Sequence, residues 1–288
     1  MRPDSPILLE AKGLTKRFGD FEAVKGVDLE VRAGEIYGFL GPNGAGKTTT
    51  IRMLSTLLNY TTGSIVIDGH QIPKDQRVAR DIIGIAQQHN GLDRDITTRE
   101  NIIHHAILHK MPKKEYTVVM EELVSIFGLE PYLDKLISDL SGGWKKKVAI
   151  VGSMIHSPRI LFLDEPTTGL DIKSRLLLWD IIKKLNARGT TIFLTTHYIE
   201  EAEALCDRIS IINGGRIVRT GTPGELCDET GRITVEENTD DYHRLTHFKT
   251  PDEAKAYMAT LEHPETAYLR NTRLEDAYLH FTDKGDSP

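Results

Sequence analysis

The sequence predicts an α/β protein built around a mostly parallel β-sheet. Residues 35–41 (EIYGFLG), 160–166 (ILFLDEP) and 191–197 (TIFLTTH) are almost continuous apolar runs. Such runs are typical of strands that are buried on both faces of a parallel sheet. Stretches with helical spacing of apolar residues follow the first two runs, and strands that alternate with helices indicate parallel crossover connections.

The chain before the first apolar run predicts a small antiparallel unit. Residues 7–19 and 23–34 alternate weakly between apolar and polar side chains, with turns expected at Gly19 and Gly34. These two strands form the predicted N-terminal antiparallel β subdomain. The run at 35–41 then leads through a glycine-rich loop into a predicted helix at 48–58.

The middle of the chain predicts helices, followed by the rest of the sheet. A helical subdomain is expected over about 89–157, with one helix that Pro112 opens and Gly128 closes. After the strand at 160–166, Asp171 can cap a helix that Gly189 closes. Further strands are expected at 191–197 and 208–212.

The predicted domain division falls at residue 224. Residues 1–224 form the main domain, and the more polar residues 225–288 form a small C-terminal α+β domain. The C-terminal domain is expected to contain one short strand at 232–237 and helices at 251–262 and 272–281.

Composition narrows the class of protein. The 288 residues are 39% hydrophobic and 27% charged, which is typical of a globular protein. A net charge of −6 offers no overall basic surface, so no nucleic-acid partner is expected. Cys206 and Cys227 form no disulfide framework and fit a reducing compartment. We see no signal peptide and no apolar run of roughly 18 residues, so any membrane association is expected to be peripheral.

Residues 41–48 (GPNGAGKT) fit the phosphate-binding P-loop pattern, in the strand–loop–helix context that the pattern requires. Backbone N–H groups of the loop and the following helix N-terminus are suited to phosphate. Lys47 is expected to reach the β and γ phosphates, and Thr48 to bind Mg²⁺. The nucleotide-binding set from this loop is Gly41, Pro42, Asn43, Gly44, Ala45, Gly46, Lys47, Thr48 and Thr49. The fold class is therefore a P-loop NTPase core with an antiparallel N-terminal subdomain, a helical subdomain and a C-terminal α+β extension.

Polar residues at the ends of other predicted strands extend this site. Asp164 is expected to hold Mg²⁺, and Glu165, facing the other way along the strand, to accept a proton from an attacking water. His197 ends a buried strand at the same sheet edge, where open parallel sheets bind ligands. Gln88 follows another apolar stretch and is suited to orienting water or touching Mg²⁺.

Residues 140–147 (LSGGWKKK) contain no strong base, nucleophile or metal-ligand cluster, yet they precede an apolar helix. Ser141 is expected to cap this helix, and its hydroxyl and the amides of Gly142 and Gly143 are suited to a γ-phosphate. The three lysines that follow cannot all face one ligand from a helix, so we expect most of them to be solvated.

Together these motifs resemble, in order, those of the nucleotide-binding subunit of an ABC (ATP-binding cassette) transporter over about residues 7–222. The resemblance implies that Phe18 stacks on adenine, that Gln88 lies in the Q-loop, that LSGGW is the signature motif, and that Asp171 lies in the D-loop. It also implies the magnesium aspartate Asp164, the catalytic glutamate Glu165 and the switch histidine His197. Trp144 departs from the family pattern, in which the fifth signature residue is usually glutamine.

The resemblance also implies cofactors and partners. ATP and Mg²⁺ are bound at the P-loop, and Ser141, Gly142 and Gly143 face the ATP of a second copy in a head-to-tail dimer. Residues 194–212 and 272–282 resemble the daunorubicin-resistance-like exporter branch, whose ATPases act with a separate transmembrane permease. The chain is therefore expected at the cytoplasmic face of the cell membrane, with permease docking around residues 88–97.

Three functions remain open from the sequence. The first is an ATPase that drives a membrane exporter. The second is a soluble ABC-type ATPase in translation or DNA maintenance, although such proteins usually have two cassettes or a long coiled-coil insertion. The third is a nucleotide-gated binding module that barely hydrolyses ATP. Intact Glu165 and His197 argue against this third function, and only Trp144 supports it.

Overall fold

A six-stranded, mostly parallel sheet forms the centre of the computed structural model, which describes residues 5–87, 91–238 and 243–283. The strand order is β10-β9-β3-β8-β7-β6, and only the β9–β10 pair is antiparallel. The strands are β3 (Ile36–Leu40), β6 (Ile83–Ala86), β7 (Ile160–Asp164), β8 (Thr191–Thr196), β9 (Arg208–Asn213) and β10 (Arg216–Gly221). Every residue of β3, β7 and β8 is buried, which explains their apolar sequences and confirms the predicted core.

The predicted antiparallel N-terminal sheet is also present, with four strands in the order β2-β1-β4-β5. Its strands are β1 (Ile7–Phe18), β2 (Phe21–Arg32), β4 (Thr62–Ile67) and β5 (His70–Ile72). Helix α1 (Lys47–Leu54) shares one hydrophobic core with this sheet and with Phe39 and Phe193 of the central sheet. Burial of these side chains fixes the position of α1, whose first turn contains Lys47 and Thr48 of the P-loop.

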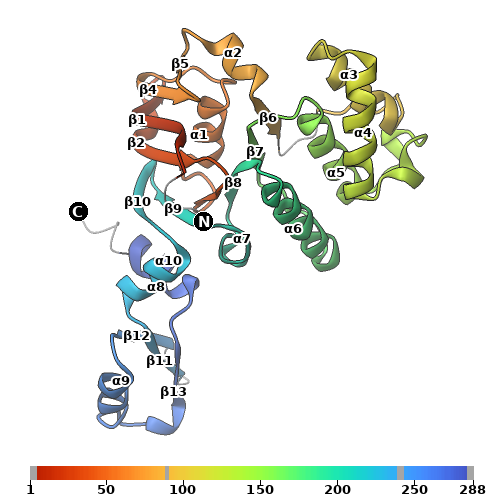
Figure 1. Ribbon diagram of the computed structural model, residues 1–288. Coiled ribbons are helices and arrows are strands. Elements are labelled where there is room, and N and C mark those ends of the chain that lie inside the picture. Colours follow the sequence, from red (N-terminus) through yellow and green to blue (C-terminus); the bar gives the residue numbers. More distant parts are fainter. Residues whose placement is uncertain (1–4, 88–90, 239–242, 284–288) are drawn as a thin grey trace.

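The helical subdomain stands to one side of the central sheet (Figure 1). It consists of α3 (Thr98–Leu108), α4 (Lys113–Phe127) and α5 (Gly142–Met154). Pro112 precedes α4 and Gly128 ends it in a left-handed conformation with φ 65°, as predicted. The short helix α2 (Gln76–Asp81) leads into β6.

Two further helices lie beside the strand ends that bear the motifs. Helix α6 (Ile172–Ala187) begins after Asp171, whose carboxylate accepts a hydrogen bond of 2.9 Å from the Ser174 N–H, so the predicted cap is confirmed. Helix α7 (Ile199–Leu205) follows β8 directly. Among the described parts of the chain, no helix is both long and apolar enough to cross a bilayer.

The C-terminal part contains more strands than expected. It comprises α8 (Pro223–Thr230), β11 (Ile233–Asn238), β12 (His243–Phe248), α9 (Pro251–Met258), β13 (Ala267–Asn271) and α10 (Leu274–Asp283). The strands form a sheet in the order β12-β11-β13, which projects away from the core in Figure 1. The strands β12 and β13 were not predicted, because their sequences are polar. The expected helices are present, but α9 ends four residues early, and residue 224 lies inside α8.

A partly buried ion cluster joins this small sheet to α10. The guanidinium of Arg270 donates to Asp276 at 2.6 and 2.8 Å and to Glu236 at 2.8 Å. We expect Arg270→Met to destabilise this part of the protein by about 3 kcal/mol, because two carboxylates would lose their buried partner. Hydrogen exchange of the β11 and β13 amides measures the effect. Arg232→Met, which removes an exposed pair with Asp228, should change exchange little.

The same cluster predicts a dependence on pH. A hydrogen bond from Tyr268, with the Arg270 contact, lowers the pKa of Glu236 from 4.5 to about 2. A group whose pKa is lower in the folded state stabilises fully above its unfolded value and loses this contribution as pH falls. We therefore expect protection of β11 to decrease between about pH 4.5 and pH 2 in the wild type. Arg270→Met should move this decrease to higher pH.

Candidate functional site

The P-loop occupies the connection from β3 to α1, at the carboxyl edge of the parallel sheet. Gly46 has φ 101°, and a Cβ there would lie 2.7 Å from the Ala23 carbonyl oxygen, so only glycine fits. Gly46 also supplies no side-chain cap to α1. The first N–H groups of α1 are therefore left for a ligand, and an anion such as phosphate is favoured.

Lys47 lies folded over the loop that precedes it. Its Nζ donates to the carbonyl oxygens of Gly41 at 2.9 Å and Pro42 at 3.0 Å, and it lies 3.4 Å from Glu165 Oε1. The side chain is only 4% exposed. A buried ammonium needs such partners, and phosphate oxygens are a strong alternative partner for it.

Asp164 and Thr48 form a set of oxygen donors beside Lys47. Thr48 Oγ1 donates to Asp164 Oδ1 at 3.4 Å, and Thr195 Oγ1 donates to the same oxygen at 2.6 Å. The parallel register of β7 and β8 places Asp164 opposite Thr195. Burial raises the pKa of Asp164, so a cation would stabilise its charged form. A hydroxyl and a carboxylate are hard oxygen ligands of the kind that Mg²⁺ takes, so the residues fit this ion.

Glu165 does not follow the strand alternation that the sequence suggested. Strand β7 ends at Asp164, and Glu165 adopts a left-handed conformation with φ 47°. Its carboxylate consequently contacts Lys47 from the same edge as Asp164, so the expectation that it faces away was wrong. The Glu165 N–H is held by Thr195, with 3.1 Å to both the hydroxyl and the carbonyl oxygen.

His197 lies within reach of the same carboxylate. Its Nδ1 is 3.3 Å from Glu165 Oε2, and Thr168 Oγ1 donates to that oxygen at 3.1 Å. Burial acts to raise the pKa of Glu165, but Lys47, His197 and Thr168 together outweigh burial and lower it. Glu165 is therefore ionised near neutral pH and is suited to accept a proton.

Thr195 was not singled out in the sequence, although it links both acidic residues. We expect Thr195→Val to lower Mg²⁺ affinity or ATP turnover about 10- to 100-fold, because the hydroxyl orients Asp164 and holds the Glu165 backbone. Magnesium titration of ATP hydrolysis measures this loss. Thr191→Val, at the other end of β8, is the matched control. If both variants needed an equally higher Mg²⁺ concentration for ATP hydrolysis, Thr195 would act only through the stability of the fold.

A cavity of about 590 Å³ opens beside these groups. Its lining comprises Phe21, Ala23, Asn43, Gly44, Gly46, Lys47, Thr48, Thr49, Glu165, Thr168 and His197. The aromatic ring at this cavity belongs to Phe21, which is 66% exposed. Phe18, the residue expected to stack on adenine, pairs with Phe21 across the hairpin but is not among the lining residues. Only the hairpin geometry distinguishes the two rings, so sequence reasoning missed Phe21.

The predicted Q-loop residue Gln88 lies outside the described residues. The preceding residue, Gln87, lines a smaller cavity of about 250 Å³ together with Thr48 and Asp164. A glutamine therefore stands next to the candidate Mg²⁺ ligands, one position before the predicted one.

The signature residues Ser141, Gly142 and Gly143 are not among the residues that line the P-loop cavity. Ser141 occupies the N-cap position of α5 as predicted, but its side chain makes no capping hydrogen bond, so that part of the prediction was wrong. The side chain is exposed instead, which leaves the hydroxyl available to a ligand. The Trp144 ring lies against the Tyr132 ring in a tilted arrangement, with centroids 4.0 Å apart, and therefore packs within the helical subdomain.

The expectation of a solvated lysine face holds only in part. Lys146 is buried, at 9% exposure, and its Nζ donates to the carbonyl oxygen of Glu165 at 3.2 Å. Lys147 lies 4.1 Å from the Trp144 ring. Folding of α5 against the end of β7 turns Lys146 inward, which no local sequence signal indicates.

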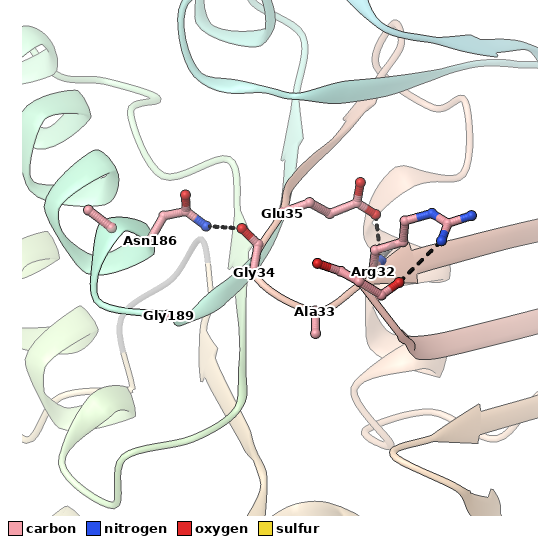
Figure 2. Close-up of a pocket in the computed structure, with 8 residues that line it drawn as sticks. Arg32, Ala33, Gly34, Glu35, Asn186 and Gly189 are labelled. Atoms are coloured by element: carbon pink, nitrogen blue, oxygen red, sulfur yellow. Dashed lines mark hydrogen bonds between the residues drawn. The ribbon is translucent and has the colours of Figure 1, made fainter. Parts of the chain in front are cut away.

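A second cavity, of about 400 Å³, lies at the opposite edge of the central sheet (Figure 2). It lies before β3 and β8, where Asn186 donates to the carbonyl oxygens of Gly34 and Thr190 and the Arg32 N–H donates to Glu35. Its lining includes none of the predicted site residues, and these polar groups are already bonded to one another. This cavity is therefore not the nucleotide site.

The parallel core with a P-loop, a paired aspartate and glutamate and a nearby histidine defines an ATPase of the ABC class. The family model described as ABC transporter matches residues 24–168. The chain belongs to this family and is an ATPase.

Curated relatives include ATP-binding proteins of exporters and of drug resistance. A daunorubicin resistance ATP-binding protein of Streptomyces coeruleorubidus is 43% identical over 225 residues, which cover 77% of this chain and 71% of that protein. A Nod factor export ATP-binding protein I of Rhizobium meliloti is 40% identical over 246 residues, which cover 85% of this chain and 73% of that protein. The chain is thus an ABC transporter ATP-binding subunit with exporter-type homologues.

Solved structures confirm the fold. An ATP-binding subunit of an ABC transporter superposes with a TM-score of 0.71 at 29% identity and covers 77% of this chain and 92% of that one. A dimeric ATP-binding cassette in a post-hydrolysis state, bound to ADP and Pi, gives a TM-score of 0.67 at 28% identity, with coverage of 74% and 98%.

Proposed function

We propose that this chain powers a membrane exporter by binding ATP between two head-to-tail copies and hydrolysing it. The observation that carries the proposal is the separation of two phosphate-suited sites. The P-loop cavity contains Lys47 and Glu165, whereas the exposed Ser141 stands at the start of α5 and does not line that cavity. A second copy can bring its own Ser141, Gly142 and Gly143 to the nucleotide.

ATP is held first through its phosphates. The free N–H groups of α1 and the ammonium of Lys47 bind the phosphates, and Phe21, with Phe18 beside it, offers an aromatic surface to the base. Thr48 and Asp164 would hold Mg²⁺, and Gln87 lines the same small cavity. Bound Mg²⁺ neutralises charge on the phosphate oxygens.

Hydrolysis then needs a base. When Lys47 turns to phosphate, the Glu165 carboxylate is released from its contact with Lys47 and can accept a proton from the attacking water. His197, 3.3 Å from Glu165 Oε2, can contact the γ-phosphate and hold the carboxylate in place. Asp171 caps α6 beside the signature helix and faces the partner copy in this arrangement.

Binding and hydrolysis favour different states of the dimer, and this difference drives a conformational cycle. We propose that the cycle acts on a separate transmembrane permease, at the cytoplasmic face of the membrane. Relatives named for daunorubicin resistance and Nod factor export support export as the direction of transport. We also propose that residues 1–224 are the nucleotide-binding domain and residues 225–288 a small C-terminal domain.

Affinity capture tests the proposal. Tagged Glu165→Gln protein is added with ATP and Mg²⁺ to detergent extracts of the native membrane. We expect a polytopic membrane protein in about equal amount, and we expect it to be lost with a Lys47→Ala, Glu165→Gln double variant. Recovery of ribosomes or of a DNA-maintenance complex, or of the tagged chain alone, would contradict the exporter proposal.

A further inference from the structure

Helix α5 carries two different functional elements on one face. The signature residues occupy its start, and Gly143 lies against the D-loop: a Cβ at Gly143 would be 3.6 Å from Leu170 and from Ser174. Lys146 follows three residues later, and helical spacing places it on the same side as Gly143. One rigid helix thus joins the signature loop to the interior of the chain.

Lys146 reaches the backbone of the catalytic glutamate. Its Nζ donates to the Glu165 carbonyl oxygen at 3.2 Å, and the lysine is 9% exposed. Burying an ammonium costs free energy unless polar partners offset the cost. Burial lowers the pKa of Lys146, and the negative charges of Asp164, Glu165 and Glu201 act against that lowering. The bond fixes the peptide group between Glu165 and Pro166, at the point where the chain leaves β7.

Another buried carboxyl group near Lys146 belongs to Glu201, on the helix that follows His197. It is fully buried on α7, and Trp179 Nε1 of α6 donates to its Oε1 at 3.1 Å. Helix α7 directly follows the strand that ends near His197, so Glu201 acts electrostatically on Lys146 from the element next to that histidine. The hydrogen bond from Lys146 to the Glu165 carbonyl oxygen joins two elements, the signature helix α5 and the end of β7.

We propose that Lys146 is a positioning residue that couples the two ATP sites of the dimer. The inference rests on the proposed head-to-tail dimer. ATP held by the partner's P-loop fixes the signature residues and therefore α5, and Lys146 then holds the Glu165 backbone in the geometry for hydrolysis at its own P-loop. Occupation of one site is thereby transmitted to the catalytic base of the other.

The test is ATP hydrolysis by the full chain as a function of ATP concentration, with Lys146→Met as the variant. With two coupled sites, the Hill coefficient of the wild type can approach 2. We expect Lys146→Met to lower this coefficient toward 1 and to lower kcat about 10-fold or more. ATP affinity, measured in a Glu165→Gln background, should be unchanged. Lys146→Arg keeps a charged hydrogen-bond donor and should therefore retain the cooperativity of the wild type. Lys145→Met removes the neighbouring lysine, which donates to Ser138, and should behave as the wild type.

The outcomes separate this inference from the proposed function. An unchanged Hill coefficient and kcat in Lys146→Met would overturn the coupling role, and so would a lower kcat without loss of cooperativity in a folded variant. If Lys146→Met fails to fold, Lys146→Arg and Lys146→Ala decide, since only Lys146→Ala lacks an N–H donor and should lose cooperativity. Failure of the Glu165→Gln chain to dimerise with ATP would instead contradict the proposed function itself.

Discussion

Glu165→Gln should reduce steady-state ATP hydrolysis at least about 100-fold, because the amide cannot accept the proton of the attacking water. The variant keeps the shape of the side chain and a hydrogen-bond acceptor for Thr168. ATP binding should therefore remain, since Lys47 and the α1 N-terminus are unchanged. Phosphate release measured over many turnovers, together with equilibrium ATP binding, separates the two effects.

The matched control is Glu200→Gln, which makes the same change on α7. Glu200 is exposed and pairs only loosely with Arg175, at 3.7 Å. We expect its turnover to match the wild type. If Glu165→Gln hydrolysed ATP at the wild-type rate, the assignment of Glu165 as the base would be wrong.

Lys47→Ala should weaken ATP binding roughly 100-fold, about 3 kcal/mol, because it removes a charge-assisted bond to the phosphates from a buried position. The same change removes a charge that lowers the pKa of Glu165, so that pKa should rise. Titration with ATP, followed by calorimetry, measures the affinity.

Lys12→Ala serves as the control for Lys47→Ala. Lys12 is an exposed lysine of β1 that pairs with Glu10 outside the P-loop cavity. Its loss should leave ATP affinity within about 2-fold of the wild type, since exposed ion pairs contribute little. Equal affinities in Lys47→Ala and the wild type would contradict the assignment of the P-loop.

The fold was predictable because strong local signals agreed with one another. Fully buried strands have continuous apolar sequences, and the P-loop pattern lay between one such strand and a helix. Asp164, Glu165 and His197 were predictable as neighbours, since the carboxyl ends of parallel strands meet at one sheet edge.

The remaining site residues depend on tertiary packing. Thr195 looks like any strand threonine until the register with β7 places its hydroxyl on Asp164. Phe21 and Phe18 are equivalent aromatics in the sequence, and the hairpin decides which ring lines the cavity. Lys146 is the middle of three lysines, and only the packing of α5 makes it a buried partner of Glu165.

The central claim is that ATP joins two copies through composite sites. It is tested most directly by measuring the molar mass of the Glu165→Gln chain in solution, with and without Mg²⁺ and ATP. We predict a mass that doubles on addition of ATP, and no doubling when Ser141→Arg is added to place a bulky side chain in the signature loop. A mass that stays that of one chain at saturating ATP, or a dimer that forms equally well with Ser141→Arg, would contradict this account.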